Sequence, residues 1–290
     1  MRICFFNGGR LGLVRDSVVH DVSTALDALP TQHYPFPRYD LLIDRLPVLR
    51  SRIEAAAGGA TVPVSEARFQ SPVANPGKIV AAPVNYRKHL DEAIAEPETF
   101  SRAHVRQIQE TGLFLKATSS LIGPSEPVRI RHLERRTDHE VELAVVMGHR
   151  CSGVGRAEAL DYVAGYCIGL DITVRGPEER SMRKSLDSYT VLGPWLVTAD
   201  ELGDASSLEF ALSVNGEPRQ HANTRDLILS VPELIEFASS FYTLEPGDVL
   251  LTGTPEGVGP VGPGDEMHAR IDGLGEMRVR VEAAAQGERS

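Results

Sequence analysis

Apolar and polar positions alternate most regularly between residues 138 and 148. Residues two apart along a β-strand point to the same face, so Glu140 and Glu142 share one face of a predicted strand. The opposite face is entirely apolar: Val141, Leu143, Val145 and Met147. Beyond Glu142 the first face also becomes apolar, at Ala144 and Val146. The pattern therefore predicts a strand that is buried on both faces and begins with two carboxylates.

Two like charges at the start of a buried strand need compensation, which a divalent cation commonly provides. A second predicted strand, residues 166–171, ends in another acid, Asp171, 29 positions after Glu142. Three carboxylates without a neighbouring His or Cys form an all-oxygen site, which favours Mg²⁺, with Mn²⁺ or Ca²⁺ as alternatives. The competing interpretation is a strand end in solvent, with Asp171 as a turn or helix cap.

The remaining periodicity predicts many short strands and few helices. Residues 1–22 form two strands around an Asn7-Gly8-Gly9 turn, and a helix is expected at 41–57. Residues 71–76 are Pro-containing and indicate a connection, so we predict a small N-terminal domain at 1–72 and a catalytic domain at 73–290.

The second domain shows no β-α-β alternation. Short strands are expected at 78–84, 113–122, 128–130 and 249–252, with a hairpin at Asn215-Gly216. Helices are expected at 157–163 and, after the capping-box spacing of Ser230 and Glu233, up to about residue 242. The fold class is therefore α+β and mainly β, a mixed or antiparallel β structure, closed or rolled, with helices outside.

Composition narrows the functional classes. The 290 residues carry a net charge of −10, which argues against nucleic-acid binding, and no apolar run is long enough to span a membrane. The chain starts with a predicted strand and shows no signal peptide. Its three cysteines form no metal-ligand motif, which favours a reducing cytoplasmic setting.

Three further groups of residues bear on chemistry. His89 and Glu92 lie three positions apart on a polar helix, where the carboxylate can orient the imidazole for water activation; an exposed polar helix is the alternative. Arg175 and Lys184 can offset surplus negative charge and attract an anionic substrate, although their segment also reads as a solvated loop. Thr254, in a glycine-rich stretch after a strand, offers a hydroxyl and an N–H, or belongs to an ordinary turn.

The order of these groups resembles the fumarylacetoacetate hydrolase family over about residues 75 to 285. The matching blocks are residues 85–89, 114–116, 140–146, 165–166 with Asp171, 184–187, 192–195 and 253–259. The resemblance implies a mixed β-roll, usually dimeric, often with a small N-terminal domain. A homodimer is expected also because two-fold dimers are the commonest assembly.

The resemblance also implies roles for individual residues. Glu140, Glu142 and Asp171 match the acids that hold a divalent metal, commonly Mg²⁺. His89 matches the general base, with Glu92 assisting, and Lys184 matches the lysine that stabilises an oxyanion. Positions that contact the substrate are matched by Arg175 and Thr254, and Tyr86 and Lys116 of the first two blocks are further candidates.

Two departures separate the chain from better-defined family members. After Arg175 it reads Gly176-Pro177-Glu178, where many members carry an acid directly after the arginine and some carry a glutamine at the position of Glu178. Asn85 stands where fumarylacetoacetate hydrolase itself has a metal-binding aspartate, so the chain is more similar to the shorter bacterial members.

The reaction implied is hydrolysis of a C–C bond in a small anionic 2-oxo acid, of acylpyruvate or diketo-acid type, through a metal-stabilised enolate. Decarboxylation of a β-keto acid such as oxaloacetate and isomerisation of a 2-hydroxy-dienedioate in aromatic catabolism use the same apparatus. A non-catalytic, metal-stabilised binding protein is the alternative from another class.

Overall fold

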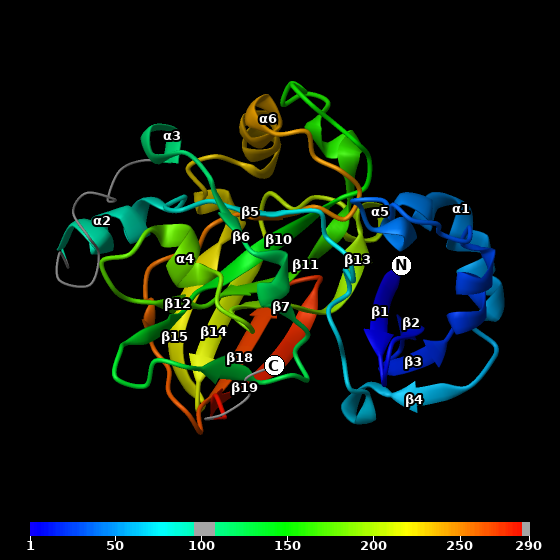
Figure 1. The fold of residues 1–290 in the computed structure, drawn as a ribbon, viewed down its shortest axis with the longest axis horizontal. Coiled ribbons are helices and arrows are strands. Elements are labelled where there is room, and N and C mark those ends of the chain that lie inside the picture. The colour runs from blue at the N-terminus through cyan, green and yellow to red at the C-terminus, as the bar shows by residue number, and fades with distance from the viewer. Residues whose placement is uncertain (96–107, 286–290) are drawn as a thin grey trace.

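The computed structural model describes residues 1–95 and 108–285, and it is a sheet-rich α+β fold (Figure 1). The largest sheet has the strand order β4-β3-β2-β1-β13-β11-β10-β16-β5-β6, with β7 added beside β13. Its strands are β1 (Arg2–Phe6), β2 (Arg10–Arg15), β3 (Val18–Asp21), β4 (Thr61–Pro63), β5 (Ile79–Ala81), β6 (Phe114–Lys116), β7 (Leu121–Ile122), β10 (Val141–Met147), β11 (Val163–Asp171), β13 (Thr190–Thr198) and β16 (Val249–Leu251).

Two smaller sheets complete the β structure. The five-stranded sheet contains, in spatial order, β15 (Glu217–Asn223), β14 (Glu209–Val214), β18 (Glu266–Ile271), β19 (Gly275–Ala283) and β8 (Val128–Ile130). The three-stranded sheet contains β12 (Thr173–Val174), β9 (Thr137–His139) and β17 (Gly259–Pro260). The helices are α1 (Leu41–Ala56), α2 (Arg87–Ala95), α3 (Ile108–Thr111), α4 (Arg180–Lys184), α5 (Ala199–Leu202) and α6 (Val231–Phe241), and they lie around the sheets (Figure 1).

The predicted alternation is confirmed over β10, but the strand does not begin at Glu140: that residue lies between β9, in the three-stranded sheet, and β10, in the large sheet. The two faces of β10 belong to different hydrophobic cores. Val141, Leu143, Val145 and Met147 pack in the larger core, between the large and the five-stranded sheets. Ala144 and Val146 pack in the second core, which also contains residues of β1, β2 and α1. The strand is therefore buried on both sides, and its start is held between two strongly apolar layers.

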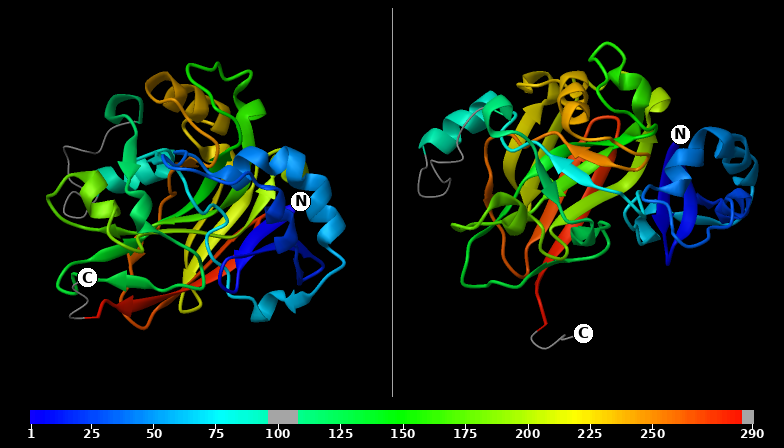
Figure 2. Two further views of the ribbon diagram at one scale, coloured as in Figure 1. Left: turned by 45° about the vertical axis from the view of Figure 1, so that its right-hand side comes forward. Right: turned by 45° about the horizontal axis from the view of Figure 1, so that its top comes forward.

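The N-terminal unit lies beside the main body and is joined to it through β-sheet pairing (Figure 2). The predicted hairpin and the predicted helix are both present, as β1–β2 and α1. Strand β1 pairs antiparallel with β13, Ile3 opposite Leu196, so one sheet crosses from the first segment into the second. The domain boundary at residue 72 stays a prediction, but the second core contains side chains from both sides of it.

Local expectations differ in their outcome. The helix after Ser230 begins with the capping box that the sequence predicts, and the Asn215-Gly216 hairpin joins β14 to β15. The helix predicted at 157–163 is wrong: only a 3-10 turn forms at Ala159–Tyr162, because Val163 already begins the long strand β11. All three cysteines are buried and free. Among the described residues, every helix is too short or too polar to cross a membrane.

Candidate active site

Two adjacent strands bring the three predicted acids together. Glu140 directly precedes β10 and Asp171 ends β11, and the Asp171 N–H donates to the Glu140 carbonyl across the antiparallel pair at 2.9 Å. One carboxylate oxygen from each of Glu140, Glu142 and Asp171 lies within 4.8 Å of the others, and all three side chains are buried. The sheet register alone therefore builds a three-carboxylate cluster.

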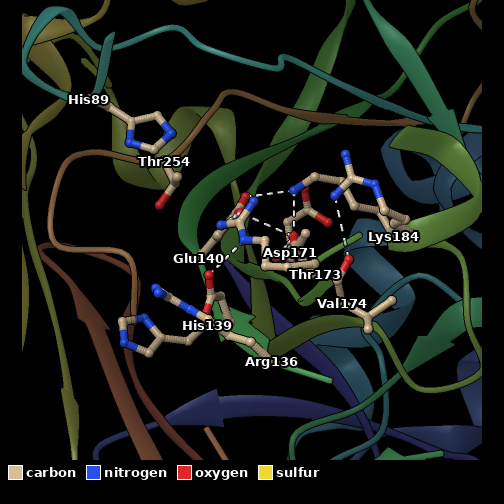
Figure 3. A network of polar contacts seen from close by, with 12 residues as sticks. His89, Arg136, His139, Glu140, Asp171, Thr173, Val174, Lys184 and Thr254 are labelled. Atoms are coloured by element: carbon tan, nitrogen blue, oxygen red, sulfur yellow. Dashed lines mark hydrogen bonds and ion pairs between the residues drawn. The ribbon is translucent and has the colours of Figure 1, made fainter. Parts of the chain in front are cut away.

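Two buried lysines, on two different elements, contact this cluster. Lys184 Nζ, on α4, donates to Glu140 Oε2 at 2.6 Å, to Asp171 Oδ2 at 2.7 Å and to Thr173 Oγ1 at 2.6 Å, which uses all three of its N–H donors (Figure 3). Lys116, on β6, is paired with Asp171 and donates to the Tyr189 carbonyl at 2.9 Å. Burial, together with the neighbouring Lys184, lowers the pKa of Lys116.

The carboxylates differ in how well the protein compensates their charge. Burial raises the pKa of Glu140, but Lys184 and Arg175 outweigh it and hold that pKa well below the usual range. Among the described residues, Glu142 accepts from one backbone donor, the Gly253 N–H at 2.7 Å. Burial and the neighbouring Asp171 raise the pKa of Glu142 well above the usual range. A buried carboxyl with this deficit, inside a hard all-oxygen donor set, fits a divalent cation.

Arg175 lies against the cluster on the side of β9. Its Nε donates to Asp138 Oδ2 at 2.6 Å and its Nη2 donates to Glu140 Oε1 at 3.1 Å. Asp138 is fully buried and also accepts from Arg136 Nε at 2.7 Å. Asp138 is a residue of the site that was not predicted, although it continues the every-second-residue series of Glu140 and Glu142 by one step.

The predicted dyad is formed on α2. His89 Nδ1 lies 2.9 Å from Glu92 Oε2, and Glu92 Oε1 accepts from the Gly257 N–H at 2.9 Å. Burial raises the pKa of Glu92, but the hydrogen bonds with His89 and Gly257 outweigh burial and leave that pKa below its usual value. The carboxylate form is therefore favoured. Figure 3 shows His89 and Thr254 on one side of the acid cluster and Lys184 on the other.

Thr254 is placed at the cluster, but its hydroxyl is already used. Its Oγ1 donates to the Val141 carbonyl at 3.0 Å and accepts from Gln220 Nε2 at 2.8 Å. The hydroxyl proton that the sequence analysis offered to a ligand is therefore engaged in the fold, and the backbone N–H is the donor that remains. Gln220 came from a polar strand with no motif, and no sequence signal identified it.

Tyr86, a further candidate, and its neighbour Asn85 are both buried. Tyr86 is 1% exposed, with its ring edge-on to Phe210 at 6.0 Å between centroids; burial and the charge of Glu142 raise its pKa well above the usual range. Asn85 is fully buried, and its amide donates to the carbonyls of Leu229 at 2.9 Å and Thr252 at 2.8 Å. Asn85 thus holds the glycine-rich loop, while a substrate contact by Tyr86 stays a prediction.

A buried three-acid cluster with adjacent lysines and a His–Glu pair could hold a divalent metal ion, as enzymes that act on small anions do. The family model described as fumarylacetoacetate (FAA) hydrolase C-terminal matches residues 78–282. The chain therefore belongs to the fumarylacetoacetate hydrolase family, as the sequence analysis inferred.

Two maleylpyruvate hydrolases are similar over nearly the whole chain. That of Aquipseudomonas alcaligenes is 56% identical over 284 residues, covering 97% of this chain and 99% of that protein. The crystal structure of the enzyme from Sphingobium sp. SYK-6, in complex with manganese and pyruvate, has a TM-score of 0.83 and 40% identity, covering 98% of this chain and 100% of that one. The mitochondrial oxaloacetate tautomerase of Bos taurus is 42% identical over 191 residues, 62% of this chain and 86% of that protein.

Proposed function

We propose that this protein is a divalent-metal-dependent acylpyruvate hydrolase, which converts an acylpyruvate and water into a carboxylic acid and pyruvate. The observation that carries the proposal is the combination of the three-acid cluster with an intact His89–Glu92 pair. The maleylpyruvate hydrolases that match nearly the whole chain support the same reaction.

Each group of residues has a separate task in this reaction. Glu140, Glu142 and Asp171 would hold the ion, which supplies Lewis acidity toward the carboxylate and 2-oxo oxygens of the substrate. Because Glu92 engages His89 Nδ1, the imidazole accepts a proton from water at Nε2, and the negative carboxylate stabilises the imidazolium.

The bonds change as follows. The water oxygen bonds to the carbonyl carbon of the acyl group, and its proton passes to His89. The bond between that carbon and the adjacent CH₂ carbon then breaks, the electron pair stays on the CH₂ carbon, and protonation there gives the methyl group of pyruvate. Lys184 is the candidate cation for the oxyanion, and to bind it the ammonium must exchange one of its three present acceptors.

The cations next to the cluster favour a substrate with a second carboxylate. Arg180 begins α4 one turn before Lys184, and both cations lie over the ring of Phe114, at 5.6 Å and 5.5 Å from its centroid. Burial and the neighbouring Arg183 lower the pKa of Arg180. A guanidinium forms paired, charge-assisted hydrogen bonds with a carboxylate, and this is the chemistry that Arg180 offers a substrate. We therefore assign the distal carboxylate of a maleylpyruvate-like substrate to Arg180.

Several finer assignments belong to the same proposal. Mg²⁺ is the proposed native ion, with Mn²⁺ and Ca²⁺ as alternatives, and the related manganese complex supports a divalent ion of this class. A cytoplasmic homodimer remains our expectation. Lys116 is assigned to holding Asp171, because its ammonium is bonded to that carboxylate, and Arg175, Thr254 and Tyr86 remain candidates for substrate contact.

Turnover of a small substrate panel tests the function. Purified protein would be incubated with maleylpyruvate, acetylpyruvate, oxaloacetate and a 2-hydroxymuconate-type dienoate, with Mg²⁺, with Mn²⁺ or with EDTA. We expect EDTA-sensitive release of pyruvate and maleate from maleylpyruvate. Isomerisation or CO₂ release as the fastest reaction would replace hydrolase by isomerase or decarboxylase, and no turnover of any member would favour the binding-protein alternative.

A further inference from the structure

The segment Arg135–Glu140 surrounds Arg175 on several sides. The Arg136 carbonyl accepts the Arg175 N–H at 2.8 Å, while Asp138 and Glu140 accept from its guanidinium. Arg135 completes the set from the surface side: its Nε and Nη2 donate to the Arg175 carbonyl at 3.0 and 2.8 Å. Both ends of the Arg175 backbone and its side chain are therefore fixed by one stretch of chain.

Glu178 fixes Arg135 in turn. Arg135 Nη1 and Nη2 donate to the two Glu178 carboxylate oxygens at 3.1 and 2.7 Å, a bidentate pair with side chains 25% and 32% exposed. Such paired, charge-assisted hydrogen bonds define an orientation as well as a distance. The Glu178 carboxylate is thus turned toward Arg135, whereas some family members carry a glutamine at the matching position.

Gly176 is the residue that makes this arrangement sterically feasible. A Cβ atom there would lie 1.9 Å from Arg135 Nη2 and 2.5 Å from Glu178 Oε2, far inside van der Waals contact. Any side chain at position 176 would therefore displace the guanidinium from the Arg175 carbonyl. Gly176, Glu178 and Arg135 therefore belong to one local structure.

The same loop leads to the catalytic lysine. Arg183 Nε donates to the Glu178 carbonyl at 2.8 Å, and Arg183 is the neighbour of Lys184 on α4. The chain between Arg175 and Lys184 is therefore held at its start by Arg135 and before its end by Arg183. A change at Arg135 acts first on Arg175, since its bonds go to the carbonyl of that residue.

We propose that Arg135 is a positioning residue that fixes Arg175 against the metal-binding acids, and that Glu178 supports Arg135 and does not bind substrate. The inference rests on the proposed function in taking the three acids as metal ligands, and its test needs no turnover. It gives the loop 175–184 a specific role outside the reacting groups.

A double-mutant cycle between Arg135 and Arg175 tests this proposal. Arg135→Ala, Arg175→Ala and the double variant would be compared with the wild type in Mn²⁺ affinity and in oxalate affinity of the Mn²⁺-loaded protein, both by calorimetry. Oxalate resembles the enolate form of pyruvate and binds without turnover, so the cycle remains valid if the substrate assignment fails. If Arg175→Ala binds no oxalate, the coupling is calculated from the Mn²⁺ affinities of the four proteins instead.

We expect Arg135→Ala to weaken oxalate binding by the Mn²⁺-loaded protein about tenfold with Arg175 present and less than twofold with Arg175 absent. Such a coupling lies in the usual range for residues in contact. Gly176→Ala should reproduce the loss without removing a charge, which covers the case in which Arg135→Ala fails to fold. Arg131→Ala removes an exposed pair with Asp187 and should change neither affinity. Equal losses in both Arg175 backgrounds, or no loss in either, would overturn the proposal.

Discussion

The acid cluster and the His89–Glu92 pair are held in the site by different means. Glu142 and Asp171 are 1% exposed, and their strands β10 and β11 each pair with a neighbour on both sides in the large sheet. The dyad lies on α2, which contacts the glycine-rich loop through the Glu92–Gly257 hydrogen bond and an exposed Lys88–Glu256 pair. The proposed metal site is therefore built into the core, while the proposed base lies on a helix at its edge.

Because the two groups are held by different elements, each should be lost independently of the other. A substitution in the cluster should remove the metal and with it substrate binding, because the three acids would bind one ion together. A substitution in the dyad should leave the metal and the substrate bound and remove only proton transfer. The predictions below either separate the two halves in this way or show that they form one unit.

The largest effect is expected for Glu142→Ala. Loss of one of three acids should remove the divalent ion and lower kcat/KM about a thousandfold or more, since every later step depends on the bound substrate. Metal content by elemental analysis and turnover under saturating Mn²⁺ measure the two consequences. The exposed Glu266→Ala, which breaks a surface pair with Arg278, is the matched control and should retain both.

His89→Gln should lower kcat about a hundredfold or more, because the general base is lost, while metal content stays at the wild-type level. Glu92→Gln should cost less, about tenfold, since it leaves the imidazole present but poorly oriented. Steady-state kinetics with parallel metal analysis compare the two. Loss of the metal in His89→Gln would show that cluster and dyad are one unit and would refute the comparison.

A smaller and more selective effect is expected at Arg180. Arg180→Met should reduce kcat/KM for maleylpyruvate about tenfold while leaving acetylpyruvate, which has no distal carboxylate, within twofold. The ratio of the two kcat/KM values is the measurement. An equal loss on both substrates would assign Arg180 to the structure of α4 instead of to substrate selection.

The smallest effect concerns stability and pH. In the metal-free protein the folded-state pKa of Glu142 lies above its ordinary value of 4.5, so the fold keeps a proton that the unfolded chain releases as the pH rises. Stability from this group is therefore lost with rising pH, and metal binding removes the loss. The difference in Tm between Mn²⁺-loaded and EDTA-treated protein should increase by a few degrees from pH 5.5 to 8. A difference in Tm that stays constant from pH 5.5 to 8 contradicts this sign. A rise in that difference that is the same in Glu142→Gln as in the wild type also contradicts it.

Much of the site was predictable because it depends on strand geometry. The alternation around Glu140 and Glu142 needs only the two-residue repeat of a strand, and Asp171 ends the next strand of the same sheet. The His89–Glu92 spacing needs only one helical turn. These are local rules, and the resemblance to a known family supplied the pairing between distant segments.

The missed residues depend on tertiary contacts that no local rule encodes. Gln220 reaches Thr254 from a strand of another sheet, and Arg135 meets Arg175 only because β9 and β12 pair. The expected helix at 157–163 was wrong because its last residue is needed for the ladder of β11. Tertiary context, here the pairing of β11 in a buried sheet, overrode the local helix propensity.

The most direct test of the account follows the oxygen of water through a single turnover. Mn²⁺-loaded protein would be mixed with maleylpyruvate in H₂¹⁸O and the products analysed by mass spectrometry. The account predicts one ¹⁸O atom in a carboxylate of maleate and none in the pyruvate carboxylate, and it predicts that His89→Gln forms this product far more slowly with metal still bound. Pyruvate formed without label in maleate, or a metal-loaded His89→Gln as fast as the wild type, would contradict it.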